Sequence, residues 1–197
     1  MDKALARYKT SESIPLELYF PMEYLQDTNF GEVLGEDLVG CGSGWEVITN
    51  VSAASESLIP PCKGIYLFIW KPSFSLPLNE RNVSFRYVVY VGSASTGSSN
   101  ILKRFTSEYK DKINTEPSVH WTSNMPSDRL SRLKKVLNLG KLEYWYIEMD
   151  KASGEQIQDI EKRLINIFNP PGNSNFKAPI RAIVDVKKTA PAFEPAF

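Results

Sequence analysis

The feature that most constrains the fold is a pair of short segments, each dense in β-branched and aromatic residues. They are residues 64–70 (GIYLFIW) and 85–91 (FRYVVYV). Such residues favour strands, and a polar stretch with two prolines separates the two segments. Alternation assigns the side chains of the first strand to two faces, Tyr66, Phe68 and Trp70 against Ile65, Leu67 and Ile69. The pattern therefore predicts an antiparallel hairpin with a long connecting loop.

The remaining pattern predicts three helices and one more strand. Helices are expected over about 100–112, 127–139 and 154–168, and the strand over 142–149. Ser99 or Asn100 can cap the first helix, Gly140 ends the second, and the Asn-Pro-Pro-Gly-Asn segment at 169–173 ends the third. We therefore expect an α+β fold, with a small antiparallel three-stranded sheet flanked by helices.

The length of 197 residues suits one domain, or one domain with an additional segment at one end. We expect an acidic N-terminal extension of unassigned fold over residues 1–60, a central domain over 61–176 and a C-terminal tail over 177–197. Residues 1–62 carry three Lys and Arg against ten Asp and Glu, whereas the rest carries 20 against 13. A basic body suggests a polyanionic partner, but on charge alone an ordinary solvated surface is the better interpretation.

Composition also narrows the cellular setting and the metal chemistry. No apolar run approaches the roughly 20 residues of a membrane span, and residues 1–15 show no secretory signal, so we expect a cytoplasmic protein without membrane contact. Cys41 and Cys62 are then expected to be reduced. The single histidine, His120, excludes sites that need several histidines, such as the usual zinc centres.

One carboxylate does not fit its expected helix face. The apolar stripe of helix 154–168 is Ile157, Ile160, Leu164, Ile165 and Phe168. Glu161 lies four residues after the first of these and three before the third, in the middle of the stripe. A buried carboxylate needs a partner, which is either an arginine or a metal ion. Magnesium is typically held by one or two carboxylates together with waters and phosphate oxygens.

Four further segments, taken in order, resemble one known family. They contain Gly64-Ile65-Tyr66, then Tyr90-Val91-Gly92, then a helix with Arg104, and then Glu161 followed by Asn173. Singly, these residues are typical of core aromatics, a solvated arginine and a turn asparagine. Together, over residues 64–173, they resemble the GIY-YIG nuclease family, and the arginine helix is closest to that of the nuclease subunit of bacterial excision repair.

The chain also departs from the family pattern. The stretch between the two signatures is longer than in compact members, and the family's frequent lysine after the second signature is Ser93 here. The His or Tyr expected one helical turn after Arg104 falls on Glu108 by strict spacing, with Tyr109 one position later. We predict that Tyr109 fills that position.

The resemblance implies a magnesium- or manganese-dependent hydrolysis of DNA phosphodiesters. It assigns the metal to Glu161, a contact with the scissile phosphate to Arg104, and the role of general base, or relay to one, to Tyr66. Tyr90 would orient water or phosphate, and Asn173 would tie the loop after Glu161 to the hairpin. The expected catalytic set is Tyr66, Tyr90, Arg104, Tyr109, Glu161 and Asn173.

Basic side chains near these segments are candidates for DNA phosphate contacts. They are Lys103, Arg129, Arg132, Lys134 and Lys135, the last four on the helix at 127–139, where they are equally typical of a plain solvated face.

The chain carries no large additional DNA-binding domain, which favours a stand-alone nuclease of restriction or phage type acting on double-stranded DNA. A restriction enzyme with one site per chain is expected to act as a homodimer. The alternatives are a non-cleaving nucleic-acid-binding module that keeps the fold, and a protein-interaction domain. The presence of Tyr66, Arg104 and Glu161 argues against the non-cleaving module.

Overall fold

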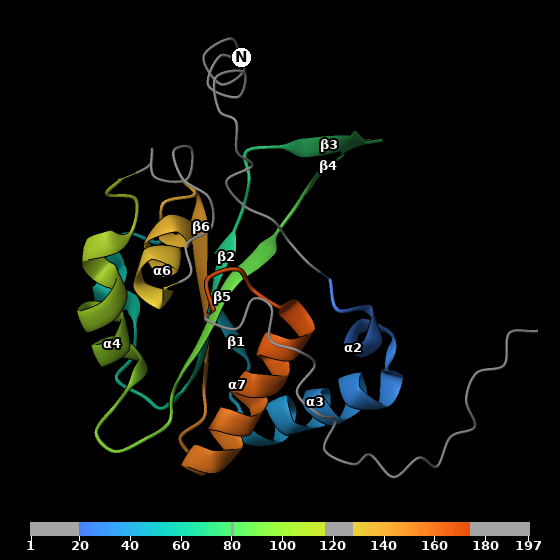
Figure 1. Cartoon of the computed structure of the whole chain (residues 1–197), viewed down its shortest axis with the longest axis vertical. Helices are drawn as coiled ribbons and strands as arrows, with labels where there is room; N and C mark the ends of the chain where they lie inside the picture. Colours follow the sequence, from blue (N-terminus) through green and yellow to red (C-terminus); the bar gives the residue numbers. More distant parts are fainter. Residues whose placement is uncertain (1–19, 80, 117–127, 174–197) are drawn as a thin grey trace, which may run out of the picture.

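The computed structural model describes residues 20–79, 81–116 and 128–173. The expected C-terminal tail and His120 lie outside these residues. No helix in the described part of the chain is long and apolar enough to cross a membrane. The fold is α+β, with an antiparallel sheet between helices (Figure 1).

The main sheet has four strands, so the expectation of three was wrong. Its order is β1 (Trp45–Ile48), β6 (Leu142–Glu148), β2 (Gly64–Trp70) and β5 (Tyr87–Ala94), all antiparallel. The added strand, β1, comes from the acidic N-terminal extension and pairs with β6 from Trp45 opposite Ile147 to Ile48 opposite Tyr144. Only Ile48 of its four residues is buried, so the burial of β1 does not alternate along the strand.

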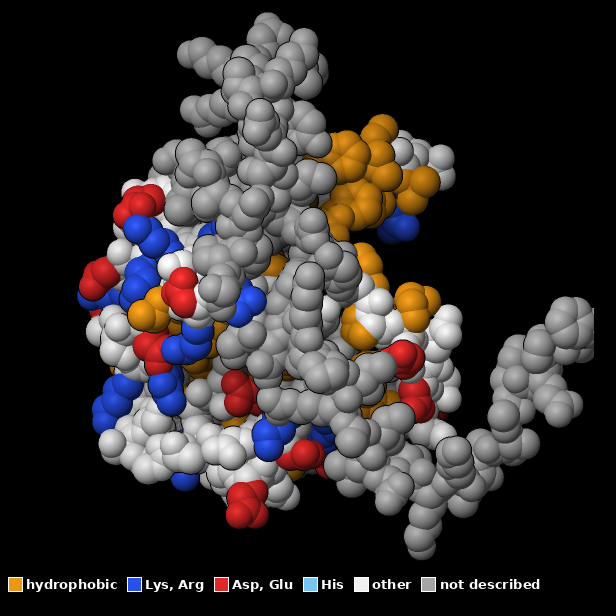
Figure 2. All heavy atoms as spheres, viewed as in Figure 1, with side chains coloured by type: hydrophobic (Ala, Val, Ile, Leu, Met, Phe, Trp, Pro, Cys, Tyr) orange, Lys and Arg blue, Asp and Glu red, His pale blue; other side chains and the backbone are white. Residues whose placement is uncertain are grey.

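The long connection between β2 and β5 contains a second, two-stranded sheet rather than only a loop. Strands β3 (Ser75–Leu78) and β4 (Arg81–Ser84) pair antiparallel, and every described position in them is exposed. This hairpin projects from the main sheet, and apolar side chains gather on it (Figures 1 and 2). Because both strands are edges, they accommodate Pro77, which cannot donate a ladder hydrogen bond.

Helices cover both faces of the main sheet (Figure 1). One face carries α4 (Ile101–Arg104), its continuations η2 (Phe105–Tyr109) and η3 (Lys110–Lys112), and α6 (Arg129–Leu137). The other carries α3 (Thr28–Cys41) and α7 (Gly154–Phe168). The short elements α2 (Met22–Gln26) and η1 (Ala53–Leu58) complete the described structure. The two faces predicted for β2 are confirmed, since Tyr66 and Phe68 join the first core cluster and Ile65, Leu67 and Ile69 join the second.

Local capping explains where the helices begin. Asn100 accepts a hydrogen bond from the Lys103 amide, Asp128 accepts one from Ser131, and Ser153 and Gln156 form a reciprocal capping box at the start of α7. After α7 the chain turns at Asn169, whose φ of 40° is left-handed. The predicted helix at 100–112 is not α-helical throughout, because η2 is a π-helical turn and η3 a 3₁₀ turn.

Candidate functional site

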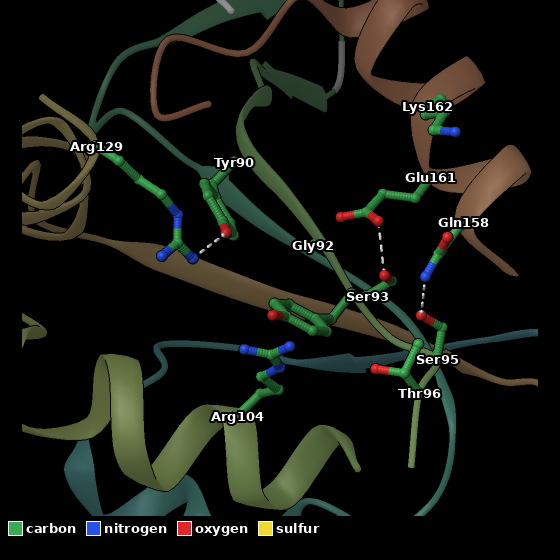
Figure 3. Close-up of a pocket in the computed structure, with 11 residues that line it drawn as sticks. Tyr90, Gly92, Ser93, Ser95, Thr96, Arg104, Arg129, Gln158, Glu161 and Lys162 are labelled. Carbon is green, nitrogen blue, oxygen red and sulfur yellow. Dashed lines mark hydrogen bonds between the residues drawn. The ribbon is translucent and has the colours of Figure 1, made fainter. Parts of the chain in front are cut away.

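A pocket of about 290 Å³ opens beside β5, one of the two edge strands of the main sheet. Its wall includes four of the six predicted catalytic residues, Tyr66, Tyr90, Arg104 and Glu161, and one predicted phosphate contact, Arg129. Arg104 comes from the helical layer on one face of the sheet and Glu161 from the layer on the other. In Figure 3 the two lie on opposite sides of the pocket. Residues distant in the sequence, on both faces of the sheet, therefore meet at one opening.

The glycine of the second signature is required by a close approach. A Cβ at Gly92 would lie 2.6 Å from three atoms of Tyr66, including its hydroxyl oxygen. The Tyr66 ring therefore lies directly across Gly92, and any side chain there would displace it. Gly64 is equally constrained, because a Cβ there would meet the carbonyl oxygen of Ile147 at 2.0 Å.

Three buried tyrosine hydroxyls form a connected group beside the pocket. The hydroxyls of Tyr66 and Tyr109 share a 2.7 Å hydrogen bond, and Tyr109 donates to the Tyr90 hydroxyl at 3.3 Å. Burial raises the pKa of Tyr66 well above its usual value, as do the nearby Tyr90 and Glu108, against the lowering effect of the Tyr109 hydrogen bond and of Arg104. The Tyr66 side chain is therefore a neutral phenol in the protein alone.

The π-helical turn accounts for the position of Tyr109. In such a turn hydrogen bonds run between residues five apart, and here the Lys110 amide donates to the Phe105 carbonyl. The residue one turn after Arg104 is then the fifth, Tyr109, whose hydroxyl reaches Tyr66. Strict α-helical spacing pointed to Glu108, which also contacts Arg104. The widened turn thus brings Tyr109 to Tyr66 and leaves Glu108 in contact with Arg104.

Glu108 joins two arginines from different helices. Its carboxylate accepts a hydrogen bond from Arg104 and another, at 2.7 Å, from Nη2 of Arg129. Burial acts to raise the pKa of Glu108, but the hydrogen bonds from Arg129 and Arg104 outweigh it and lower the pKa. From the sequence, Arg129 was a candidate phosphate contact on a basic helix, and Glu108 was the residue that strict spacing places one turn after Arg104; their contact with each other was not predicted. That contact could not be found from the periodicity of one helix.

Glu161 is half-buried at the pocket wall, and among the described residues its hydrogen-bond partner is a serine rather than an arginine. The Ser93 hydroxyl donates to one carboxylate oxygen at 2.6 Å (Figure 3). Among the described residues Glu161 has no ion pair, and its neighbour Arg163 pairs instead with Asp37 and Asp159. Burial raises the pKa of Glu161, against the lowering effects of Ser93, Arg104, Arg129 and Lys162.

The Glu161 carboxylate fits a magnesium-type ion only if the protein supplies few of the ligands of that ion. Within the described ranges no group of three or more His, Cys, Asp or Glu side chains could hold a metal. Glu161 offers one carboxylate oxygen beyond the one bound to Ser93, so waters and phosphate oxygens would have to supply the remaining ligands. Ser93, noted in the sequence only as a departure from the expected lysine, holds this carboxylate.

Asn173 ties the segment after α7 to the edge of β5. Its side-chain oxygen accepts from the Val91 amide at 3.0 Å, and its nitrogen donates to the Val91 carbonyl at 2.8 Å. The Gly172 amide also donates to the Val89 carbonyl. The segment thus covers the strand edge as far as Val91, and the pocket is lined by the next residues, Gly92 and Ser93.

The remaining predicted phosphate contacts do not form one basic surface. Lys135 is fully buried, and this burial lowers its pKa, so its side chain fits neither the predicted phosphate contact nor the alternative of a solvated face. Lys134 forms an ion pair with Glu116 at 2.8 Å. Lys103 is exposed and donates to the Ser98 carbonyl, while Arg132 is half-buried. Figure 2 shows basic and acidic side chains interspersed over this part of the molecule.

Comparison of the chain with protein-family models, with curated proteins and with solved structures found no match.

Proposed function

We propose that the protein is a metal-dependent DNA endonuclease of the GIY-YIG type. The observation that carries the proposal is the meeting of Tyr66, Arg104 and Glu161 in one pocket. They come from β2, α4 and α7, and the resemblance assigns all three to catalysis. If Tyr66 were only a core aromatic, Arg104 only a solvated side chain and Glu161 only a member of an ion pair, nothing would require the three to line one pocket. A phosphodiesterase site does require it, because it needs a base, a cation and a metal ligand together.

The residues divide the work of hydrolysis between them. Arg104 presents charged donors that stabilise the negative charge developing on the phosphate. Glu161, oriented by Ser93, would hold the divalent cation. A bound Mg²⁺ or Mn²⁺ would supply Lewis-acid stabilisation of the phosphate and of the leaving oxygen.

Tyr66 takes the proton of the attacking water when its own hydroxyl is ionised, and a hydrogen bond from the Tyr109 hydroxyl stabilises that phenolate. Because burial raises the pKa of Tyr66, proton acceptance depends on positive charge near its hydroxyl, which Arg104 supplies in part. Tyr90, held by Arg129 at 3.1 Å, orients water or phosphate.

The substrate in this proposal is double-stranded DNA, and the enzyme is a nuclease of restriction or phage type. Cutting both strands with one site per chain would bring two copies together on the DNA.

The proposal is tested on long, unmodified bacteriophage DNA, which contains many potential recognition sites. The purified chain is incubated with the DNA in Mg²⁺, in Mn²⁺ and in EDTA, and the ends of any fragments are sequenced. We expect fragments with either metal and intact DNA in EDTA, with Glu161→Gln inactive throughout. Binding to the same DNA is followed by gel shift. Binding without cutting in both metals would favour the non-cleaving module, and absence of both binding and cutting would favour the protein-interaction domain.

A further inference from the structure

Arg129 enters the pocket from a different helix than Arg104. It lies in the first turn of α6, and its Nη2 donates to the Tyr90 hydroxyl at 3.1 Å and to the Glu108 carboxylate at 2.7 Å. Figure 3 shows Arg129 and Arg104 approaching the same region of the pocket, across from Glu161. Arg129 is therefore a component of the pocket wall, unlike Lys134 on the same helix, which pairs with Glu116.

Glu108 binds both arginines without lining the pocket. One carboxylate oxygen accepts from Arg104 and the other from Arg129, whereas the pocket wall includes both arginines and not Glu108. The carboxylate therefore holds the two guanidinium groups from behind and leaves their pocket side open to a ligand. A guanidinium carries five N–H donors, so each arginine keeps donors beyond those it gives to Glu108. The Nε of Arg104 is buried and has no hydrogen-bond partner among the described residues.

The charge of this wall matches an anion. Arg104, Arg129 and Lys162 line the pocket as cations, and Glu161, across from the two arginines, is the one carboxylate that the described residues contribute to the lining. Two guanidinium groups joined by one carboxylate keep a net positive charge on their side. Converging arginines are a preferred arrangement for phosphate oxygens, because each presents parallel donors.

We propose that Arg129 is a second catalytic arginine, which binds the scissile phosphate together with Arg104, and that Glu108 is the positioning residue that holds both. The identification of this phosphate as the one at which DNA is cut rests on the proposed nuclease function. The capacity of the two arginines to bind phosphate does not, and the two parts are tested separately.

The first experiment measures phosphate binding without cleavage. Inorganic phosphate is titrated into the metal-free protein, and binding is followed by NMR chemical shifts in the wild type, Arg129→Gln and Arg81→Gln. Arg81 is an exposed arginine on the β3–β4 hairpin and supplies the matched control. We expect saturable binding in the wild type and in Arg81→Gln, and at least tenfold weaker binding in Arg129→Gln. Equal affinity in all three proteins, or no binding in the wild type, overturns the proposal.

Glu108→Gln tests the positioning role by a double-mutant cycle. If Glu108 acts through the arginines, its loss weakens phosphate binding in the wild-type background and has a smaller effect when Arg129 is already Gln. Equal effects in the two backgrounds would show that Glu108 does not act through Arg129. Thermal melting of each variant separates this loss of affinity from unfolding.

Cleavage then addresses the scissile phosphate. In single-turnover assays Arg129→Gln should slow cutting about 10²–10³-fold, the effect of removing one preorganised charge-stabilising donor. The slope of DNA affinity against salt concentration, measured in EDTA, should fall by about one phosphate contact. Cutting at the wild-type rate would overturn the catalytic role. A wild type that binds phosphate but cuts no DNA would refute the nuclease function and leave the phosphate site established.

Discussion

Replacing Tyr66 by Phe removes one hydroxyl from a buried cluster and separates a catalytic role from a packing role. The ring keeps its place, stacked on Tyr144 at 5.6 Å between centroids and lying across Gly92. The hydroxyl loses its 2.7 Å hydrogen bond with Tyr109, but the Tyr109 hydroxyl keeps partners in Tyr90 and Glu108, both at 3.3 Å. No buried group is left unsatisfied, so the free energy of unfolding should fall by only about 1 kcal/mol.

Tyr144→Phe is the matched control, because it makes the same chemical change in the same cluster. The Tyr144 hydroxyl is buried, has no hydrogen-bond partner among the described residues and does not line the pocket. Its removal should leave stability unchanged or raise it slightly, since an unsatisfied polar group is lost. Activity should stay at the wild-type level.

The expected difference between the two variants lies in catalysis. Loss of a general base typically costs 10²–10⁴-fold in rate, whereas a stability change of about 1 kcal/mol lowers Tm by roughly 2–4 °C in a chain of this size. Single-turnover cleavage and thermal melting are measured for Tyr66→Phe, Tyr144→Phe and Tyr90→Phe, with a milder loss expected for the last. Equal, small rate losses in Tyr66→Phe and Tyr90→Phe would refute the assignment of either hydroxyl as the base.

Three further substitutions test the remaining parts of the site. Glu161→Gln should abolish cleavage, and it should also abolish the rise in Tm that Mg²⁺ produces in the wild type. Melting curves of both proteins are measured with and without the metal. An equal rise in Tm in the two proteins would show that Glu161 is not the ligand. Because burial raises the folded-state pKa of Glu161 above 4.5, its contribution to stability is full below that pH and is lost as the pH rises through the folded-state pKa. Without metal at pH 7, the Gln variant should therefore melt at or above the temperature of the wild type. Arg104→Ala should lose about 2–4 kcal/mol of transition-state stabilisation in kcat/KM, with only a small change in Tm because its side chain is 40% exposed; global unfolding would instead identify a structural role. Gly92→Ala should cost about 1–3 kcal/mol of stability in a denaturation assay, because the new Cβ would overlap the Tyr66 ring; wild-type stability would mean that the ring has room to move.

Local pattern was sufficient for most of the main elements. Alternation in β2 assigned its side chains to the correct faces, and the apolar stripe of α7 marked Glu161 as the carboxylate facing the sheet. These predictions rest on the period of a strand or a helix, which a few consecutive residues determine. Asn173 could be linked to the hairpin through the resemblance, and the structure shows its two hydrogen bonds with Val91.

The tertiary structure decided what depends on segments far apart in the chain. Strand β1 exists because β6 offers a free edge, and its four residues carry little pattern of their own. On α6 the pattern by residue type failed, since Leu130 is 62% exposed while Lys135 is fully buried. The π-helical turn that brings Tyr109 to Tyr66, and the meeting of Arg104 with Arg129 at Glu108, have no local signal. The sequence by itself predicted Tyr66, Arg104 and Glu161 as site residues, together with the strand or helix on which each lies. Only the packing of helices on the two sheet faces decided which charges meet, because such contacts depend on distances between elements that no single period encodes.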